Sequence, residues 1–494
     1  MGKDMIKRLI IVNRGEIAVR IIRTCRDLGI TSIAVYDESD VGSLHVLLAD
    51  ESVKLDSPKT FTDPKQLLEL ARLRKADAIH PGYSFLSESA EFARDCNAAG
   101  ILFIGPSAEA LTICASRIDI LNKAQEANLM VPEHTVSPLD PSDTELICKE
   151  AEKLGYPVAV KPFRASSGKA SPVAYDGDEL RRAILTVARE AEVTLQDQRV
   201  YLEKAVQPGR RIQVPFLADN FGNVLPLGLI DVSISRHFNR IMSETPPPGI
   251  SPEQEQKLTA AAVNFVRKAR LNNLGTIEFW LDQSGQFYLT KLLPSIQIEH
   301  SATELVLDLD VVTEQIKLAC GEKLSEPVPQ HRGVAIQMRV YAEDLLRQSL
   351  PSPGTLRRFR LPGGPNVRVD AYAYGGCRIP IHFDPLLAAI SVWAPDRKTG
   401  LNRLSRALRD AAITGVETNL GNLQAVVCDQ EVMSGEYNSD TGKRLAQAIS
   451  VSTAASDDLA ALVGAAFYMR RRAHAVAKPA RLSGGWYEAS RAID

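Results

Sequence analysis

The sequence predicts a protein of the α/β and α+β classes, with a doubly wound parallel α/β domain at the N-terminus followed by α+β units. Three observations support this prediction. Residues 1–105 alternate short β-rich runs with amphipathic helical segments, which is the pattern of a parallel sheet covered by helices on both faces. Residues 206–447 contain many strand-like runs. A chain of 494 residues exceeds one hydrophobic core and is expected to form about two to four domains.

The N-terminal segment begins with the run RLIIVN, which favours a strand, and continues with the helical run EIAVRIIRTCRDLG. In that second run Ile17, Ile21, Cys25 and Leu28 recur at helical spacing, and Gly29 closes the helix. The runs TSIAVY, ADAIHPGY and ILFIGP repeat the strand pattern, with helical segments between them. The turn NRGEIAVR contains one glycine, so it does not match the glycine-rich fingerprint of a dinucleotide-binding fold.

The rest of the chain divides where composition and pattern change. Residues 106–132 predict linker helices, and a proline-rich connector leads into a small unit at 133–205 with two helices and two strands. Residues 206–447 predict a larger α+β region, with strands such as IQVPFLAD, GTIEFWLD and QFYLTKLL. Residues 448–494 form a tail that contains the basic helical segment AALVGAAFYMRRRAHA, which is typical of a solvated face or a docking segment.

The composition excludes several classes of function. A net charge of -2 gives no electrostatic footprint for nucleic acid or for an anionic membrane, and no apolar run approaches membrane-spanning length. Seven scattered cysteines without a CxxC pair indicate reduced core residues rather than disulfides or a zinc site. The N-terminus lacks the apolar stretch of a signal peptide. We therefore expect a soluble, cytoplasmic protein with no nucleic-acid or membrane partner.

A series of longer motifs is specific enough to indicate a family. The motifs are IVNRGEIAVRIIRTCRDLGI, HVLLADESVKL, AIHPGYSFLSES, FIGPSAEA, SIQIEHSATELV, YAED with LPSPGTL, and GVETNL. In this order and spacing, over roughly residues 5–447, the chain resembles biotin carboxylase. The resemblance implies the fold of that family, which has an N-terminal α/β domain, an ATP-grasp lid and body, and a C-terminal α+β domain.

The resemblance also implies a reaction and the residues that perform it. Biotin carboxylases use ATP and Mg²⁺ to activate bicarbonate, and then carboxylate biotin on a separate carrier protein or domain. At matching positions the chain keeps a phosphate-contacting lysine (Lys161), an adenine hinge (Glu203 and Lys204), one metal-binding glutamate (Glu278), two bicarbonate contacts (Gln297 and the general base Glu299) and the arginine that steadies the biotin enolate (Arg339). No MKM or MKL motif occurs, so we expect no covalent biotin on this chain.

Other positions depart from the family pattern. The glycine-rich flap after Lys161 reads PFRASSGKASPV, in which Gly168 is the one remaining glycine. Proline removes N–H donors and side chains block a close approach, so this segment is poorly suited to cradling phosphates. Residues that the family uses near the nucleotide and bicarbonate are also replaced; the replacements are Arg117, Arg211, Gln213, Ser235, Phe238 and Arg240.

The stretch FYLTKLLPSIQIEH, residues 287–300, combines kept and replaced residues on what the alternation predicts to be one strand. Lys291 stands at the second metal glutamate, Leu293 at an asparagine and Ser295 at the bicarbonate-binding arginine. An ammonium group repels a divalent ion. We therefore expect Lys291 to pair with Glu278 in place of the metal.

Because the replacements cluster on one reaction, we interpret the chain as a non-catalytic subunit of a biotin-dependent acyl-CoA (acetyl-CoA) carboxylase, a system of fatty acid biosynthesis. Its expected partners are itself or an active biotin carboxylase, a separate biotin carboxyl carrier protein, and carboxyltransferase subunits. The family dimerises through positions that correspond to Arg20, Arg23 and Arg368, whereas an aromatic residue there is replaced by Pro365. Two alternatives remain: an active biotin carboxylase with relocated metal ligands, and a nucleotide-sensing protein that is not an enzyme.

Overall fold

The computed structural model describes residues 6–83, 85–164, 172–195, 197–205, 208–236, 239–324, 329–347, 349–442, 444–445 and 463–469. The chain divides into two compact units, Met1–Leu445 and Ala446–Asp494. In the second unit residues 463–469 form a helix whose side chains are all exposed. None of the helices described is both long and apolar enough to cross a bilayer.

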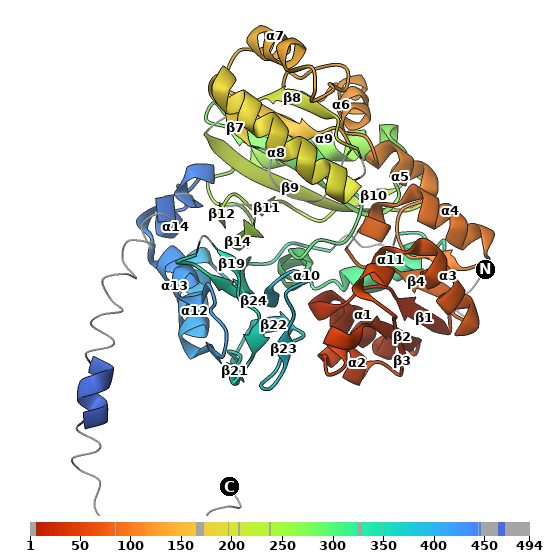
Figure 1. The fold of residues 1–494 in the computed structure, drawn as a ribbon, viewed down its shortest axis with the longest axis vertical. Coiled ribbons are helices and arrows are strands. Elements are labelled where there is room, and N and C mark those ends of the chain that lie inside the picture. Colours follow the sequence, from red (N-terminus) through yellow and green to blue (C-terminus); the bar gives the residue numbers. More distant parts are fainter. Residues whose placement is uncertain are drawn as a thin grey trace, which may run out of the picture. The chain divides into compact units, whose positions relative to one another are not determined.

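The N-terminal parallel sheet forms as predicted. Its strands are β1 (Arg8–Ile11), β2 (Thr31–Tyr36), β3 (Glu51–Lys54), β4 (Ala78–His80) and β5 (Leu102–Phe103), in the spatial order β3–β2–β1–β4–β5. Leu9 and Ile11 pack on one face with α1 (Gly15–Leu28), whereas Ile10 packs on the other with α3 (Pro64–Leu73) and α4 (Ala90–Ala98). Helix α1 ends at Gly29, which has a positive φ of 70°. Helices therefore cover both faces of the sheet (Figure 1).

A small sheet with two helices, within residues 144–204, follows and is called the lid below. Strands β6 (Val158–Pro162), β7 (Val173–Ala174) and β8 (Val200–Lys204) pair in the order β7–β6–β8. Helices α7 (Thr144–Leu154) and α8 (Gly177–Leu195) share a core with Val158 and Val160 of β6 and with Leu202 of β8. The alternate residues Lys161 and Glu203 are therefore on the face of this sheet that is turned away from the helices.

The larger part that follows, called the body, is built on a long antiparallel sheet with helices packed against it. Its strands, in spatial order, are β16 (Phe287–Leu293), β15 (Asn273–Asp282), β9 (Gly209–Ala218), β11 (Ile230–Asp231), β14 (Met242–Thr245), β17 (Val334–Tyr341), β24 (Leu386–Ala394) and β22 (Val367–Ala371). A ninth strand, β10 (Val224–Pro226), also pairs with β9. Helices α6 (Arg117–Glu126) and α9 (Pro252–Lys268) share a core with β9 and β15, whereas α12 (Arg397–Asp410) and α13 (Leu420–Cys428) share one with β17 and β24. The hairpin β12 (Ser235–Arg236) and β13 (Asn239–Arg240) forms a separate pair.

The prediction of one strand over residues 287–300 is wrong in its second half. Strand β16 ends at Leu293, and residues 294–299 form a turn that leads into α10 (His300–Leu307). Pro294 follows the last strand residue and has no backbone N–H to donate to a neighbouring strand. Glu299 takes the N-cap position of α10. Gln297 and Glu299 therefore do not continue the face of β16.

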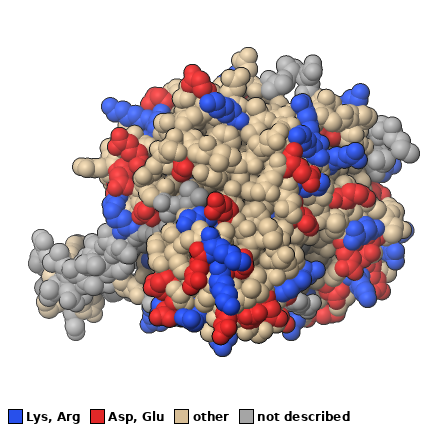
Figure 2. Space-filling model, turned by 90° about the horizontal axis from the view of Figure 1, so that it is seen from above, with Lys and Arg blue, Asp and Glu red and all other residues tan. Residues whose placement is uncertain are grey.

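Charged side chains of both signs are interspersed over the face of the molecule in Figure 2. Lys and Arg do not gather there into one continuous area, in keeping with the net charge of -2. A nucleic-acid-binding surface would require a basic stripe or patch, and the residues coloured by charge on this face do not form a continuous one.

Candidate functional site

Three neighbouring strands of the body sheet place polar side chains on one face. Gln213 and Arg211 of β9 lie opposite Glu278 and Trp280 of β15, and Lys291 of β16 lies opposite Glu278 on the other side. These five residues share a face because side chains alternate along a strand and directly opposed residues point the same way. The alternate residues belong to the apolar core below, and include Ile212, Val214, Ile277 and Phe279.

The guanidinium of Arg240 joins the two carboxylates to which the family resemblance assigns metal binding and proton abstraction. Its Nη2 lies 2.5 Å from Glu278 Oε2, and its Nη1 lies 3.0 Å from Glu299 Oε1. Burial would raise the pKa of Glu278, but Arg240, Lys291 and Arg211 lower it to about 2. Glu278 therefore stays ionised, and the cation that it pairs with is Arg240 of the protein itself.

Lys291 lies opposite Glu278 without being its ion-pair partner. In the part of the chain that the structure describes, no carboxylate is within ion-pair distance of Lys291 Nζ, and Arg240 makes the ion pair that we expected from Lys291. Burial lowers the pKa of Lys291 to about 7; Glu278 opposes this shift, while Arg117, Arg240 and Arg211 add to it. Arg240 approaches Glu278 from the hairpin of β12 and β13, and its planar guanidinium matches a carboxylate better than the point charge of an ammonium does.

A divalent metal ion does not fit these residues. Mg²⁺ is usually bound through one or two carboxylates together with waters and substrate phosphates, and here Arg240 contacts both Glu278 and Glu299. Gln213 Nε2 donates to Glu278 Oε2 at 3.2 Å, on the oxygen that Arg240 also contacts. Unit charges about 4 Å apart interact by roughly 4 kcal/mol at an effective dielectric constant of about 20, so Lys291 would further oppose a divalent ion.

Glu299 is held by two guanidinium groups. Besides Arg240, Arg339 Nη2 lies 2.5 Å from Glu299 Oε1, and both partners of this pair are buried. Burial would raise the pKa of Glu299, but Arg339 and Arg240 lower it. A carboxylate with a lowered pKa is a weaker proton acceptor, so Glu299 is poorly placed to act as a general base in this state.

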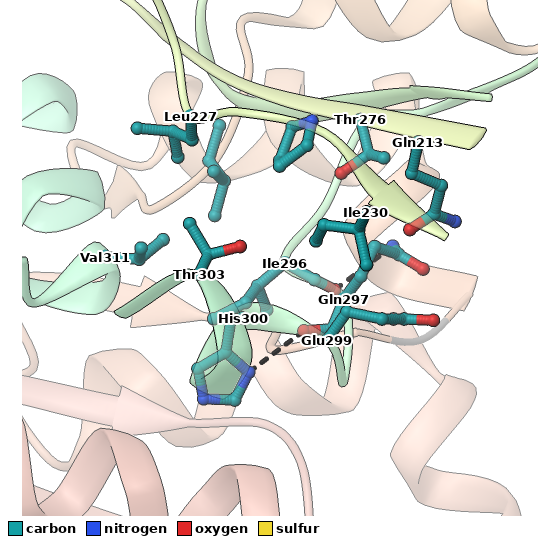
Figure 3. Close-up of a pocket in the computed structure, with 12 residues that line it drawn as sticks. Gln213, Leu227, Ile230, Thr276, Ile296, Gln297, Glu299, His300, Thr303 and Val311 are labelled. Carbon is teal, nitrogen blue, oxygen red and sulfur yellow. Dashed lines mark hydrogen bonds between the residues drawn. The ribbon is translucent and has the colours of Figure 1, made fainter. Parts of the chain in front are cut away.

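In the turn between β16 and α10, the side chain of Gln297 bonds to nearby residues of the same turn. Gln297 Nε2 donates to Ser295 Oγ at 3.1 Å and to the Ser295 carbonyl oxygen at 3.2 Å, and His300 Nδ1 lies 2.9 Å from the Gln297 carbonyl oxygen. Ser295 and Leu293 are both buried. Figure 3 shows that Gln297, Glu299 and His300 reach one pocket together with Gln213, Thr276, Thr303 and several apolar residues.

The three lid residues predicted to contact nucleotide have partners within the lid. Lys161 Nζ lies 2.5 Å from Glu203 Oε1, and the Tyr201 hydroxyl donates to Glu203 Oε2 at 2.9 Å. Lys204 Nζ donates to the carbonyl oxygens of Gly155 at 2.6 Å and Tyr156 at 3.1 Å. Burial and the repulsion of Arg117 and Arg211 lower the pKa of Lys161 in spite of Glu203. The side chains of Lys161, Glu203 and Lys204 thus have protein partners already.

The structure describes some, but not all, of the positions at which residues that the family uses near the nucleotide are replaced. Gly168 and Phe238 lie outside the described residues, and Ser235 lies on β12. Arg117 Nη1 donates to the Thr290 carbonyl oxygen at 2.9 Å. The guanidinium of Arg211 lies over the Trp280 ring, 5.4 Å from its centroid. Arg117 thus extends from α6 to the backbone of β16, the strand of Lys291, and Arg211 lies on β9, two strands away from it.

The three arginines that the resemblance assigns to the dimer interface have different surroundings. Arg20 pairs with Glu304 at 2.8 Å, and Arg368 pairs with the same Glu304 at 2.6 Å. Arg23 is exposed, and so is Pro365. Arg20 and Arg368 thus have carboxylate partners within the chain, whereas Arg23 faces solvent on α1.

Sequence reasoning missed two residues that complete this arrangement. Tyr201 supplies the second hydrogen bond to Glu203, and Glu304 links Arg20 to Arg368. The alternation of β8 could have placed Tyr201 beside Glu203, because residues two apart on a strand share a face. No local signal identifies Glu304, since its partners are far away in the sequence.

Comparisons with known proteins identify the family of the chain. Family sequence models match three successive parts of the chain: the N-terminal domain of biotin carboxylase over residues 5–111, the ATP-binding domain of the carbamoyl-phosphate synthase L chain over 117–327, and the C-terminal domain of biotin carboxylase over 337–442. Together they span most of the described fold.

Individual relatives and a solved structure also match the chain over most of its length. The chain is 38% identical over 442 residues to the biotin carboxylase of Nostoc sp., covering 87% of this chain and 97% of the relative. It is 36% identical over 440 residues to biotin carboxylase 1 of Bacillus subtilis, covering 88% and 97%. The biotin carboxylase domain dimer of Hydrogenobacter thermophilus 2-oxoglutarate carboxylase, solved with MgADP, ADP and bicarbonate, matches with a TM-score of 0.86 at 31% identity, covering 89% and 98%. The chain belongs to the biotin carboxylase family.

Proposed function

We propose that this chain is a catalytically inactive biotin carboxylase-like subunit of a biotin-dependent acyl-CoA carboxylase, with acetyl-CoA as the acyl-CoA substrate of the complex. It acts as a structural and regulatory partner of an active biotin carboxylase or of the biotin carboxyl carrier protein. The observation that carries the proposal is the Arg240 guanidinium, which contacts Glu278 and Glu299 together. Metal binding and proton abstraction would each require one of these carboxylates, and both are engaged by a protein cation.

Three further features support an inactive site. Lys291 adds positive charge beside Glu278, Ser295 provides no guanidinium for bicarbonate, and Lys161 is paired with Glu203. Loss of one electrostatic contact to a transition state typically lowers the rate about a hundredfold or more. Three such losses in one reaction would remove measurable turnover.

The test is release of ADP by the purified chain with ATP, Mg²⁺, bicarbonate and free biotin. We expect a rate no higher than the blank, because the metal and the bicarbonate each lack one of the residues that bind them in the family. Biotin carboxylase 1 of Bacillus subtilis, assayed in parallel, serves as the positive control for the reagents. Release of ADP that rises with added bicarbonate would overturn the proposal and favour an active enzyme with relocated ligands.

A further inference from the structure

Lys291 lacks a counter-charge of its own. Arg240 makes the ion pair with Glu278, and within the described part of the chain no carboxylate lies within ion-pair distance of Lys291 Nζ. Arg117, Arg240 and Arg211 all repel its ammonium form. The charged form of Lys291 is therefore poorly supported, because a charge that is removed from water without a partner loses solvation that nothing replaces.

The positive groups around Lys291 come from separate elements. Arg211 lies on β9, on the same face of the sheet as Lys291, with its guanidinium over the Trp280 ring. Arg117 extends from α6 and donates from Nη1 to the carbonyl oxygen of Thr290, the residue before Lys291. The Nε of Arg117 is buried and has no hydrogen-bond partner among the described residues. An anion formed at the Lys291 amine would thus lie beside guanidinium groups from two elements.

The Lys291 amine also has the two properties of a reactive lysine. Burial, reinforced by the neighbouring arginines, lowers its pKa to about 7. A large share of the amine is then neutral near neutral pH, and the neutral amine is the nucleophilic form. The side chain is nevertheless partly exposed, so a molecule as small as CO₂ can reach Nζ.

We propose that Lys291 is carboxylated on Nζ by CO₂ to form a lysine carbamate, whose negative charge is balanced by Arg117 and Arg211. The nitrogen lone pair forms a bond to the carbon of CO₂, one C=O electron pair moves onto oxygen, and a proton leaves the nitrogen for solvent. The reaction requires no oxidant or reductant, and dissolved bicarbonate supplies CO₂ by equilibration.

Charge favours this modification over the other reactions of an amine. A Schiff base or an acetyl group would leave the nitrogen positive or neutral, whereas a carbamate adds the anion that this cluster lacks. It also places a carboxylate on the position where the family resemblance expects a glutamate. The inference concerns the chemistry of Lys291 alone and holds whether or not the chain turns over ATP or pairs with an active subunit.

The test uses the full chain in EDTA, with isotopically labelled bicarbonate as the source of CO₂. Trapping with a trialkyloxonium salt converts a labile carbamate into a stable ester, and peptide mass mapping then locates the label. We expect the label on Lys291 and not on an exposed lysine such as Lys149 of α7. Absence of label from Lys291, or equal labelling of Lys149, would overturn the inference.

Substitution separates a carbamate from a bicarbonate ion that is only bound. In the wild type, bicarbonate should raise the melting temperature more than chloride at the same ionic strength, because a modification confined to the folded state stabilises that state. Lys291→Arg keeps the positive charge but forms no carbamate, so it should lose both the label and the response to bicarbonate. The matched control, Lys149→Met, should keep both. A response to bicarbonate that persists in Lys291→Arg would indicate a non-covalent ion and contradict the assignment.

Arg211→Met tests the proposed counter-charge. It removes one cation beside the carbamate and should reduce labelling of Lys291 about tenfold, whereas Arg211→Lys keeps the charge and should retain most of the label. At constant CO₂ concentration, labelling should also fall as the pH drops below about 7, because the amine is then protonated. Unchanged labelling in an Arg211→Met variant with a native circular dichroism spectrum would contradict the role given to the arginines.

Discussion

Arg240 shows at the level of one residue how the site differs from a metal-binding one. The two terminal nitrogens of its guanidinium contact two different carboxylates, Glu278 and Glu299. The ammonium of a lysine is a single point charge on a flexible stem and lacks the fork that spans both oxygens in a fixed geometry. An exchange of lysine for arginine is therefore sufficient to connect the two acids.

This geometry predicts how metal binding could be recovered. Lys291→Glu alone should not create an Mg²⁺ site, because Arg240 still occupies Glu278. Lys291→Glu combined with Arg240→Lys should produce an Mg²⁺-dependent rise in melting temperature, since two carboxylates then face each other across β15 and β16. Differential scanning calorimetry with and without Mg²⁺ measures the rise. Adding Glu278→Gln to the double variant is the control and should abolish it; equal responses of the single and double variants would contradict the role given to Arg240.

At the scale of elements, the lid sheet is held by a polar contact on the face that its helices do not cover. Lys161 of β6 and Glu203 of β8 are both buried, and Tyr201 completes the carboxylate's hydrogen bonding. Removing one member of a buried ion pair leaves an uncompensated charge. The pair is thus expected to stabilise the lid in the absence of nucleotide.

A double-mutant cycle tests this contribution. Lys161→Met should lower the free energy of unfolding by about 3 kcal/mol, because Glu203 is left charged and buried. Lys161→Met with Glu203→Gln should recover most of that loss, since no unpaired charge remains. Urea denaturation followed by circular dichroism provides the values. If the two substitutions were additive, the pair would not be coupled and the nucleotide-contacting role of Lys161 would be favoured instead.

At the scale of the whole molecule, the arginines near the expected dimer interface divide into two groups. Arg20 and Arg368 converge on Glu304, which ties α1 to α10 and β22 within one chain. Arg23 projects from the exposed side of α1. The Hydrogenobacter relative was solved as a dimer of this domain, and we propose that Arg23 contributes to a similar contact here.

The two groups should respond differently to substitution. Arg23→Glu should weaken pairing, either with a second copy or with a co-expressed active biotin carboxylase, while changing the free energy of unfolding by no more than about 0.5 kcal/mol. Arg20→Ala should lower that free energy by about 3 kcal/mol, because it removes one cation from two carboxylates, Glu304 and Asp310. Native mass spectrometry and affinity pull-down with the carrier protein report the pairing. A wild-type chain that stays monomeric with both partners would contradict the assembly role.

The sequence by itself determined the elements that depend on neighbours along the chain. The alternation of residues 8–36 predicted β1, α1 and β2, and Gly29 predicted the end of α1, because strand and helix periodicities repeat within a few residues. The motifs predicted the family, whereas the loss of the metal that we expect from Lys291 and the loss of the bicarbonate contact that we expect from Ser295 stay predictions.

Only the tertiary structure decided which charges meet. Arg240 reaches Glu278 and Glu299 across 38 and 59 positions of sequence, and Lys161 reaches Glu203 across 42. Lys291 was expected to pair with Glu278, and the two residues do lie opposite each other on neighbouring strands. That position alone does not decide which of several nearby cations contacts the carboxylate. Strand adjacency and side-chain geometry determine ion pairs, and both arise from long-range packing that no local pattern records.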